Sequence, residues 1–296
     1  MSAGRRLAAI FNPVSAGGRF KKDLPLIVGS LRGLGFEVHE MPTEATGHAI
    51  ELAREAVARG YETVCAIGGD GTVNEVVNGI AGSGATFAII PTGTVNVLAM
   101  ELGIPLDPPD ACQLAAQGHA IDIDLGRAGD RYFALMAGAG LDAAVISAMN
   151  PALKRALKEA AFAIQGVASY FAGDFPRMLV AAEEASVEGY FVVVGNSSNY
   201  GGAFGITPVA DMRDGLLDVC VLTDKSFLQM SYYWLAALVS SHLKHPKVEY
   251  FRTERVDLSL APGEEGEVLV QTDGEMAGRL PLTIEVAPLA LNVITP

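Results

Sequence analysis

The sequence has little cysteine and no long apolar run, and each shortage excludes a class of protein. Only three cysteines, Cys65, Cys112 and Cys220, occur among 296 residues, and they are scattered. Such a set indicates buried thiols in a reducing compartment rather than a disulfide framework or a zinc site. No stretch approaches the ~18 apolar residues of a spanning helix, and the first apolar run ends at Asn12-Pro13, unlike a signal peptide. We therefore expect a cytoplasmic protein.

Positive charge is also scarce. Acidic residues number 34 and basic residues 21, so the formal net charge is −13. This balance argues against a nucleic-acid partner, whose phosphates demand a basic surface. It also argues against electrostatic attraction to anionic lipids as the main membrane anchor, although a local basic patch is still compatible with this net charge. The five histidines show no metal-ligand spacing, and we expect them to be exposed to solvent.

Two familiar phosphate-binding motifs are absent as well. The chain contains neither Gly-x-x-x-x-Gly-Lys-Ser/Thr nor Gly-x-Gly-x-x-Gly, which excludes a P-loop and a dinucleotide fingerprint. What the chain does have is 50% hydrophobic residues and 33 glycines. That composition is typical of a compact globular enzyme rather than a disordered chain.

Apolar runs alternate with helical segments up to about residue 124. We expect strands at 7–11, 36–39, 63–67 and 86–90, and helices at 20–34, 48–59 and 74–80. Continuous apolar strands separated by helices predict a parallel sheet covered on both faces, an α/β domain over residues 1–124. Ligands of such sheets bind beyond the carboxyl ends of the strands.

The pattern changes in residues 125–296, which we expect to form a mostly antiparallel, β-sandwich-like domain. The last residues are candidates for a return to the first domain. The expected strands are 132–136, 191–195, 217–222, 256–260 and 268–272, and the helical patches are 150–171 and 227–243. Gly and Asp-Gly turn signals separate many of these strands.

Three polar loops follow strands of the first domain. The second of them, Gly68-Gly69-Asp70-Gly71-Thr72, lies between a strand and a helix. Its glycines let backbone approach phosphate oxygens, and the helix start offers unpaired N–H groups. Taken alone it is also compatible with an ordinary strand-turn-helix corner. Loops at 12–18 and 91–96 should open on the same sheet edge, and three such loops together favour an anionic ligand.

These loops resemble those of the diacylglycerol-kinase-like lipid kinases, and the resemblance covers nearly the whole chain. Asn12, Pro13 and Ser15 fit Asn-Pro-x-Ser-Gly, although Ala16 stands where glycine is usual. The second loop fits Gly-Gly-Asp-Gly-Thr-x-Asn-Glu through Asn74 and Glu75, and Thr94 lies in Pro-x-Gly-Thr-x-Asn. Thr43 falls where the family has a threonine near the nucleotide. The resemblance implies that these residues bind ATP, in a domain like those of phosphofructokinase and NAD kinase.

The second domain carries two further matches. Asp211, Asp214 and Leu216 resemble the family's magnesium-binding turn, with Leu216 contributing its carbonyl oxygen. Asp273-Gly274-Glu275 resembles the family's catalytic Asp-Gly-Glu. Each is also a plain Asp-Gly hairpin signal when the resemblance is set aside.

The resemblance also implies roles for the carboxylates. Glu275 is the first choice for the general base, and Asp273 would orient it or assist the metal. Asp70 would hold Mg²⁺ directly or through water, or would itself be the base.

The implied activity is ATP-dependent phosphorylation of a lipid hydroxyl. Diacylglycerol, phosphatidylglycerol, a sphingoid base and ceramide all remain open as acceptors. A lipid substrate implies transient contact with the inner membrane face. The segment 136–141 and the helical patch 153–171 are candidate walls of an apolar groove for the lipid, and the helical patch is also a candidate for lying on the membrane surface. An NAD-kinase-like enzyme and an inactive nucleotide-binding regulator are the alternatives. A homodimer through a sheet edge stays open.

Overall fold

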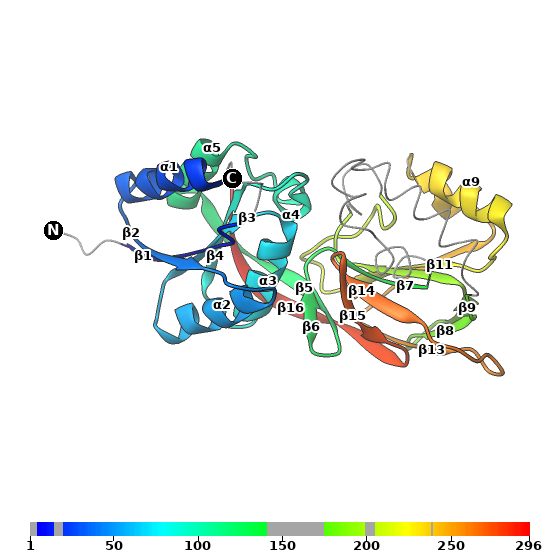
Figure 1. Cartoon of the computed structure of the whole chain (residues 1–296). Helices are drawn as coiled ribbons and strands as arrows, with labels where there is room; N and C mark the ends of the chain where they lie inside the picture. Colours follow the sequence, from blue (N-terminus) through cyan, green and yellow to red (C-terminus); the bar gives the residue numbers. More distant parts are fainter. Residues whose placement is uncertain (1–4, 15–19, 141–174, 199–204, 238) are drawn as a thin grey trace. The chain divides into compact units, whose positions relative to one another are not determined.

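The computed structural model describes residues 5–14, 20–140, 175–198, 205–237 and 239–296 (Figure 1). Contacts divide the chain into two compact units, Met1–Leu125 with Pro288–Pro296, and Gly126–Ala287. We call them unit 1 and unit 2. The sequence-based boundary stood at residue 124. The helical patch expected at 150–171 lies outside the described residues.

Unit 1 is an α/β domain, as predicted. Its strands are β1 (Arg5–Phe11), β2 (Phe36–Pro42), β3 (Thr63–Gly68) and β4 (Thr86–Pro91), and its helices are α1 (Phe20–Gly33), α2 (His48–Ala58), α3 (Asp70–Ile80), α4 (Val97–Glu101) and α5 (Pro108–Gln117). The strands pair in parallel in the order β2-β1-β3-β4. Helix α1 packs with α5 and α2 packs with α3, and the two pairs cover opposite faces of the sheet (Figure 1).

Two long strands belong to both units. They are β5 (His119–Ala128) and β16 (Leu282–Thr295). The beginning of β16 pairs antiparallel with a strand of unit 2, and Asn292 and Val293 near its end pair in parallel with β4 of unit 1. The side chain of Asn292 also accepts a hydrogen bond from Thr86 Oγ1 at 3.0 Å. The last residues of the chain are therefore part of the first domain's sheet.

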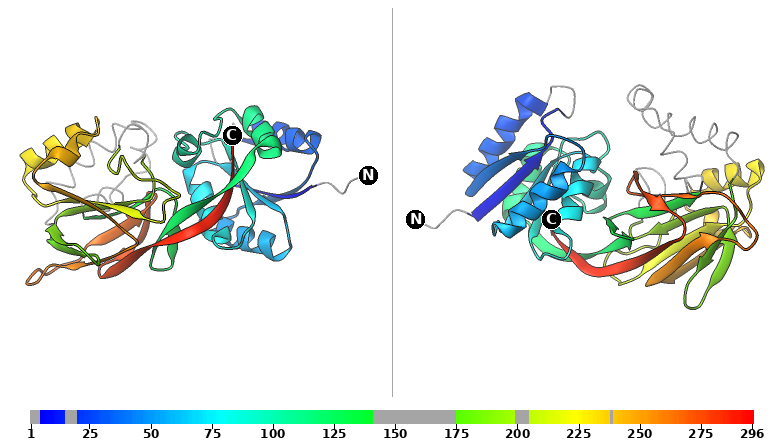
Figure 2. Two further views of the ribbon diagram at one scale, coloured as in Figure 1. Left: turned by 180° about the vertical axis from the view of Figure 1, so that it is seen from behind. Right: turned by 60° about the horizontal axis from the view of Figure 1, so that its bottom comes forward.

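Unit 2 is built mainly from antiparallel strands (Figure 2). Its elements are β6 (Arg131–Phe133), β7 (Met136–Gly140), β8 (Met178–Ala181), β9 (Ser186–Gly189), β10 (Phe191–Gly195), β11 (Leu217–Leu222), α9 (Phe227–Ala237), a 3-10 turn (His242–Lys244), β12 (Val248–Thr253), β13 (Arg255–Leu260), β14 (Leu269–Thr272) and β15 (Glu275–Arg279). One sheet has the order β12-β11-β10-β7-β14-β15, and the other contains β16-β13-β8-β9.

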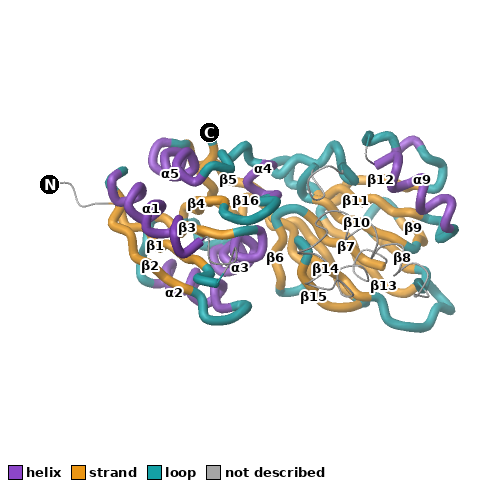
Figure 3. The backbone as a smooth tube through the Cα atoms, turned by 45° about the horizontal axis from the view of Figure 1, so that its top comes forward, coloured by secondary structure: helices purple, strands orange, loops and turns teal. Residues whose placement is uncertain are grey.

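An apolar core lies between these two sheets. Val192 and Val219 of the first sheet and Val256 and Leu258 of the second are among its buried members. A second apolar cluster joins Phe191 of β10 to Tyr233 of α9, the helix labelled in Figure 3. Unit 2 is therefore a sandwich with a helix on one outer face. The predicted fold class is confirmed for both units.

Three expected elements differ from the observed ones. The strand predicted at 132–136 was wrong, because it is interrupted at Ala134 and Leu135, whose N–H groups bond to the Asp273 side chain rather than to a neighbouring strand. The helix expected from Asn74 begins at Asp70. The helix expected at 227–243 ends at Ala237, and the Ser241 N–H and hydroxyl both bond to the Ala236 carbonyl beyond that end.

Candidate active site

Unit 1 gathers its polar loops at one edge of the sheet. Strands β1, β3 and β4 are parallel neighbours, so their carboxyl ends open on the same edge. Asn12 follows β1, Gly69 follows β3 and Thr92 follows β4. The expected convergence of the three loops follows from this strand order.

The second and third loops touch each other through backbone. The Thr92 N–H donates to the Gly68 carbonyl at 2.9 Å. A Cβ added to Gly69 would lie 3.0 Å from the Gly93 Cα, and one added to Gly68 would lie 2.7 Å from Thr72 Oγ1. A side chain at Gly69 would therefore push the two loops apart, and one at Gly68 would displace Thr72 within its own loop. The loops present exposed backbone and small polar groups at Gly71 and Thr94, which suits the close approach of an anion.

Asp70, the first residue of α3, fixes the shape of the third loop. Its Oδ1 accepts the Val97 N–H at 2.6 Å, and its Oδ2 accepts the Asn96 N–H at 3.1 Å. Asn96 precedes α4 in a left-handed conformation with φ of 59°, which costs free energy for a residue other than glycine. Its side chain bonds to both the N–H and the carbonyl of Gly93. Asp70 therefore supports this strained turn.

The Asp70 carboxylate still fits a role beside magnesium. A carboxylate has about four lone-pair sites, and two backbone N–H groups leave others for a metal-bound water. No ion pair within the part of the chain that the structure describes joins Asp70. Its negative charge is thus not neutralised by a described side chain.

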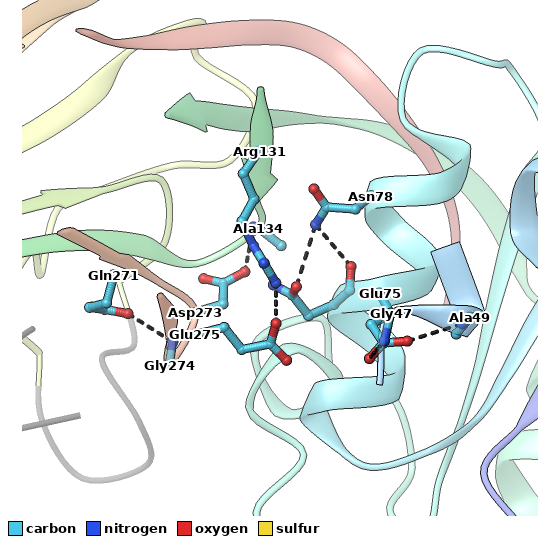
Figure 4. Close-up of polar contacts among 11 residues, drawn as sticks. Gly47, Ala49, Glu75, Asn78, Arg131, Ala134, Gln271, Asp273, Gly274 and Glu275 are labelled. Carbon is cyan, nitrogen blue, oxygen red and sulfur yellow. Dashed lines mark hydrogen bonds and ion pairs between the residues drawn. The ribbon is translucent and has the colours of Figure 1, made fainter. Parts of the chain in front are cut away.

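Glu75 lies further along α3 and is buried. Its Oε1 accepts the Gly47 N–H at 2.8 Å and its Oε2 accepts the Ala49 N–H at 3.0 Å, so both oxygens hold the start of α2 (Figure 4). The neighbouring Asn74 is buried as well. These contacts make Glu75 a positioning residue for the loop before α2, and a direct contact with nucleotide stays a prediction.

The remaining predicted nucleotide residues lie at the same sheet edge. Asn12 Oδ1 accepts the Val14 N–H at 3.0 Å, which closes a turn containing Pro13. Thr43 follows β2, is buried, and donates its N–H to the Phe11 carbonyl at 2.8 Å. Ser15 lies outside the described residues.

In unit 2, Asp273 and Gly274 form the two-residue turn between β14 and β15. Their φ angles are 47° and 83°, the left-handed values that such a hairpin turn requires and that Asp and Gly adopt most readily. The hairpin predicted from Asp-Gly is present. It places Glu275 at the first position of β15.

The Asp273 carboxylate accepts three backbone N–H groups. Oδ2 accepts the Ala134 N–H at 2.8 Å, and Oδ1 accepts the N–H groups of Leu135 and Met136 at 3.0 and 2.9 Å. On the other side of this segment, Asn196 Nδ2 donates to the Ala134 carbonyl at 2.8 Å. Asp273 is thus a positioning residue that joins the hairpin to the residues before β7.

Glu275 has a different kind of partner. Its Oε2 forms an ion pair with Arg131 Nη2, and both side chains are partly exposed (Figure 4). Within the described residues, no hydrogen bond occupies Oε1. Sequence reasoning missed Arg131, because it lies 144 positions from Glu275 and no short motif joins the two. The Asp-Gly hairpin alone gave no signal for it.

The predicted magnesium turn in unit 2 carries a guanidinium beside its main carboxylate. Asp214 Oδ1 accepts the Leu216 N–H at 3.0 Å, and Oδ2 accepts Arg252 Nη1 at 2.8 Å. Asp211 Oδ1 accepts the Arg213 N–H at 3.0 Å. Arg252 already neutralises Asp214, so this arrangement does not fit a divalent cation, and we assign no reaction step to one here. In the described ranges, no group of three or more His, Cys, Asp or Glu residues could hold a metal ion.

Burial makes the cysteines and His242 poor candidates for a catalytic role. The three cysteines are buried and free, as expected, and burial raises the pKa of Cys112 to about 11 and that of Cys220 to about 12. Thiols held in the protonated form are poor nucleophiles. The expectation of exposed histidines was wrong for His242, which is fully buried with Nε2 at 2.9 Å from the Ile206 carbonyl oxygen.

Comparisons with known proteins agree with this architecture. Residues 6–128 match the family model of the diacylglycerol kinase catalytic domain. Residues 136–295 match the YegS C-terminal NAD kinase beta sandwich-like domain. The chain therefore belongs to the diacylglycerol-kinase-like family of lipid kinases, and it is a lipid kinase by class.

Similar proteins cover the chain almost end to end. A diacylglycerol kinase of Staphylococcus saprophyticus is 29% identical over 99% of this chain and 96% of its own length. A diacylglycerol kinase of Staphylococcus carnosus is 28% identical over 99% of this chain and 95% of its own. The crystal structure of a proposed diacylglycerol kinase from Bacillus anthracis has a TM-score of 0.83 at 23% identity, covering 100% of this chain and 97% of that one. The structural likeness supports the fold.

Proposed function

We propose that this protein transfers the γ-phosphate of ATP to the hydroxyl group of a membrane lipid. The observation that carries the proposal is the contact between the two glycine loops after β3 and β4. These loops present backbone at the carboxyl edge of a parallel sheet, where Asp70 also lies. Phosphoryl transfer depends mainly on positioning and charge neutralisation, and this edge offers both.

Each loop has a proposed task in holding ATP. The backbone of Gly68, Gly69 and Gly71 and the hydroxyl of Thr72 approach the phosphates from the start of α3. Asn12, Pro13 and Ser15 form the loop after β1, and Thr94 forms the loop after β4. Thr43 and the helix start held by Glu75 complete the same edge. Exposed N–H groups at a helix start favour negative charge, which supports this assignment.

Magnesium bound with ATP would neutralise phosphate charge. Asp70 is the residue of unit 1 that we propose to hold it, through water, because its oxygens are already shared with two backbone N–H groups. The same contacts keep the Asp70 carboxylate in one orientation.

Glu275 is the proposed general base. Its Oε1 removes the proton from the lipid hydroxyl as that oxygen attacks the γ-phosphorus, and the bond from phosphorus to the bridging oxygen breaks to leave ADP. Arg131 holds Oε2 and so limits the rotation of the carboxylate. Asp273 acts through the hairpin, because its oxygens are bound to three N–H groups. Asp70 is the alternative general base, and replacing each of the two residues in turn distinguishes between these assignments.

The acceptor is proposed as a class. The relatives named diacylglycerol kinase put diacylglycerol first in the test, followed by phosphatidylglycerol, a sphingoid base and ceramide. Within the described residues, no helix is long and apolar enough to cross a bilayer. We propose that the enzyme works in the cytoplasm and meets its substrate at the inner membrane face.

The test is incubation of the purified chain with γ-labelled ATP, magnesium and each lipid alcohol in detergent micelles, followed by thin-layer chromatography. We expect one class to accept label. Conversion of NAD to NADP without lipid labelling would support the NAD-kinase alternative. No ATP consumption with any acceptor would support a regulator without catalysis.

A further inference from the structure

Helix α9 of unit 2 carries large apolar side chains on two opposite sides. Met230, Tyr233 and Ala237 are buried against the apolar cluster on the outer face of the six-stranded sheet. On the other side, Leu228 is 76% exposed, Tyr232 51% and Leu235 67%. At 3.6 residues per turn, these three side chains lie within about 60° of one another around the helix. We call them the α9 stripe.

An outward helix face of this kind is unusual for a water-exposed position. Surface helices normally carry charged or polar residues opposite the core. Residues 227–237 contain no Asp, Glu, Lys or Arg. Beyond the helix, Val239 adds another apolar side chain that is 73% exposed. A contiguous exposed apolar surface of this type marks an interaction site.

Basic residues border the α9 stripe. The His245 ring contacts Tyr232, with centroids 4.8 Å apart. Lys244 and Lys247 on either side of His245 are exposed, and the Lys247 carbonyl accepts the Thr223 N–H at 2.9 Å, which brings exposed Lys225 to the same end of the helix. Residues 223–248 hold three lysines and one acidic residue, Asp224, in a chain of net charge −13.

The electrostatic surroundings of Asp224 agree with this clustering. The pKa of Asp224 is lowered, first by hydrogen bonds with Ser226 and further by the positive charges of Lys247 and His245. The one acidic group of the segment is therefore close to two of its basic groups. Glu249 is a further exposed acidic residue just beyond this segment, and the three lysines outnumber the two carboxylates, so the border of the stripe is locally basic in an acidic chain.

We propose that the α9 stripe and its basic border form a docking surface for an anionic lipid bilayer. The leucines enter the boundary between headgroups and acyl chains, and the lysines contact anionic headgroups. Tyr232 has the apolar ring and polar hydroxyl that suit this boundary. The choice of a lipid surface rests on the proposed function, since a lipid kinase must reach its substrate at a membrane.

A second copy of the chain suits this surface less well. A two-fold contact that packs two α9 stripes in parallel would bring one basic border against the other, and residues 227–237 contain no acidic side chain to offset this charge. Like charges brought together across an interface are unfavourable. An anionic bilayer instead complements both the apolar stripe and its basic border.

The test is flotation of the full-length chain with vesicles of phosphatidylcholine and phosphatidylglycerol in equal parts, without ATP. We expect binding that weakens with added salt. Leu235→Glu should weaken it roughly tenfold or more, because the variant replaces an apolar side chain that enters the bilayer with a carboxylate that anionic headgroups repel. Lys247→Glu should weaken it less and reduce the salt dependence.

The matched control is Leu26→Glu on α1 of unit 1, where the leucine is 72% exposed. It should bind vesicles like the wild type, and all variants should keep the wild-type circular dichroism spectrum and melting temperature. Absence of wild-type binding at low salt, or equal binding by the Leu235→Glu and Leu26→Glu variants, would overturn the proposal. So would a dimer in analytical ultracentrifugation that Leu235→Glu dissociates without changing vesicle binding.

Kinase assays keep this proposal separate from the proposed function. With a short-chain acceptor that is soluble in water, the Leu235→Glu variant should keep the wild-type kcat. With the same headgroup in vesicles, its apparent KM should rise roughly tenfold, in line with the lost binding. Vesicle binding without any lipid phosphorylation would contradict the proposed kinase function and would still support the docking surface. Lipid phosphorylation at the same apparent KM by the wild type and the Leu235→Glu variant would support the kinase function and contradict the docking surface.

Discussion

Helix α3 of unit 1 and the Asp-Gly-Glu turn of unit 2 each carry two acidic residues, but the two pairs have different partners. On α3, Asp70 and Glu75 both accept backbone N–H groups. In the turn, Asp273 does the same, whereas the partner that the described residues offer the Glu275 carboxylate is the Arg131 guanidinium. Three of the four carboxylates hold backbone in place, and one is held by a side chain. We therefore expect that replacing Glu275 lowers the activity and leaves the stability of the fold unchanged.

The largest effect is expected for Asp273→Ala, which should lower both the stability of the protein and its activity. Three backbone N–H groups lose their acceptor, and bonds to a charged group contribute about 1.5–3 kcal/mol each without being additive. We expect the free energy of unfolding to fall by about 3 kcal/mol and lipid phosphorylation to be lost with it. Thermal unfolding followed by circular dichroism measures the first. A wild-type melting temperature would mean that Asp273 does not support the hairpin.

Asp70→Asn separates hydrogen bonding from charge in unit 1. The amide oxygen can still accept one N–H from the start of α4, so we expect a stability loss of about 1 kcal/mol. Loss of the negative charge should reduce kcat strongly and raise the magnesium concentration needed for half-maximal rate. Titration of magnesium at saturating ATP checks this. Unchanged magnesium dependence would contradict a role for Asp70 beside the metal.

Glu75→Gln should affect stability more than nucleotide affinity. One of the two N–H groups at the start of α2 keeps an acceptor, and the other loses it at a cost of about 1–2 kcal/mol. Calorimetric titration with a non-hydrolysable ATP analogue should give a dissociation constant close to the wild type. A large loss of affinity at an unchanged melting temperature would instead make Glu75 a direct nucleotide ligand.

The smallest effect is expected for His242 of unit 2 and concerns the stability of the protein at acid pH. Burial lowers the pKa of His242 below the value of about 6.5 that an unfolded histidine has. The unfolded chain therefore binds more protons as pH falls through about 6.5, and the free energy of unfolding decreases. His242→Gln should make stability less dependent on pH between about 7 and 5. Denaturant unfolding at both pH values measures the difference, and an unchanged slope would contradict it.

Much of the fold was readable from local patterns. Continuous apolar strands such as residues 63–67, with a glycine after each early helix, predict the parallel sheet of unit 1 without any knowledge of contacts. The end of the chain was harder, because β16 pairs with strands of both units, and which strands it pairs with is decided by tertiary packing.

For the site, the sequence predicted the types of residue and their spacing along the chain, and it did not predict their contacts. The sequence could place Asp70 after β3 and Glu275 after a turn. It could not tell that Asp70 supports α4, because Asn96 and Val97 lie 26 and 27 positions away. The interruption of the strand expected at 132–136 has the same origin, since its backbone bonds to Asp273. Long-range contacts between side chains and backbone decide these roles.

The most direct test of the proposed catalytic chemistry is Glu275→Gln with γ-labelled ATP and the lipid class that the wild type labels. The glutamine is nearly isosteric but cannot accept a proton at neutral pH. We predict an unchanged melting temperature, unchanged ATP binding, and a kcat reduced by roughly 10²–10⁴-fold, as for loss of a general base. Near-normal turnover would contradict the assignment of Glu275 as the base.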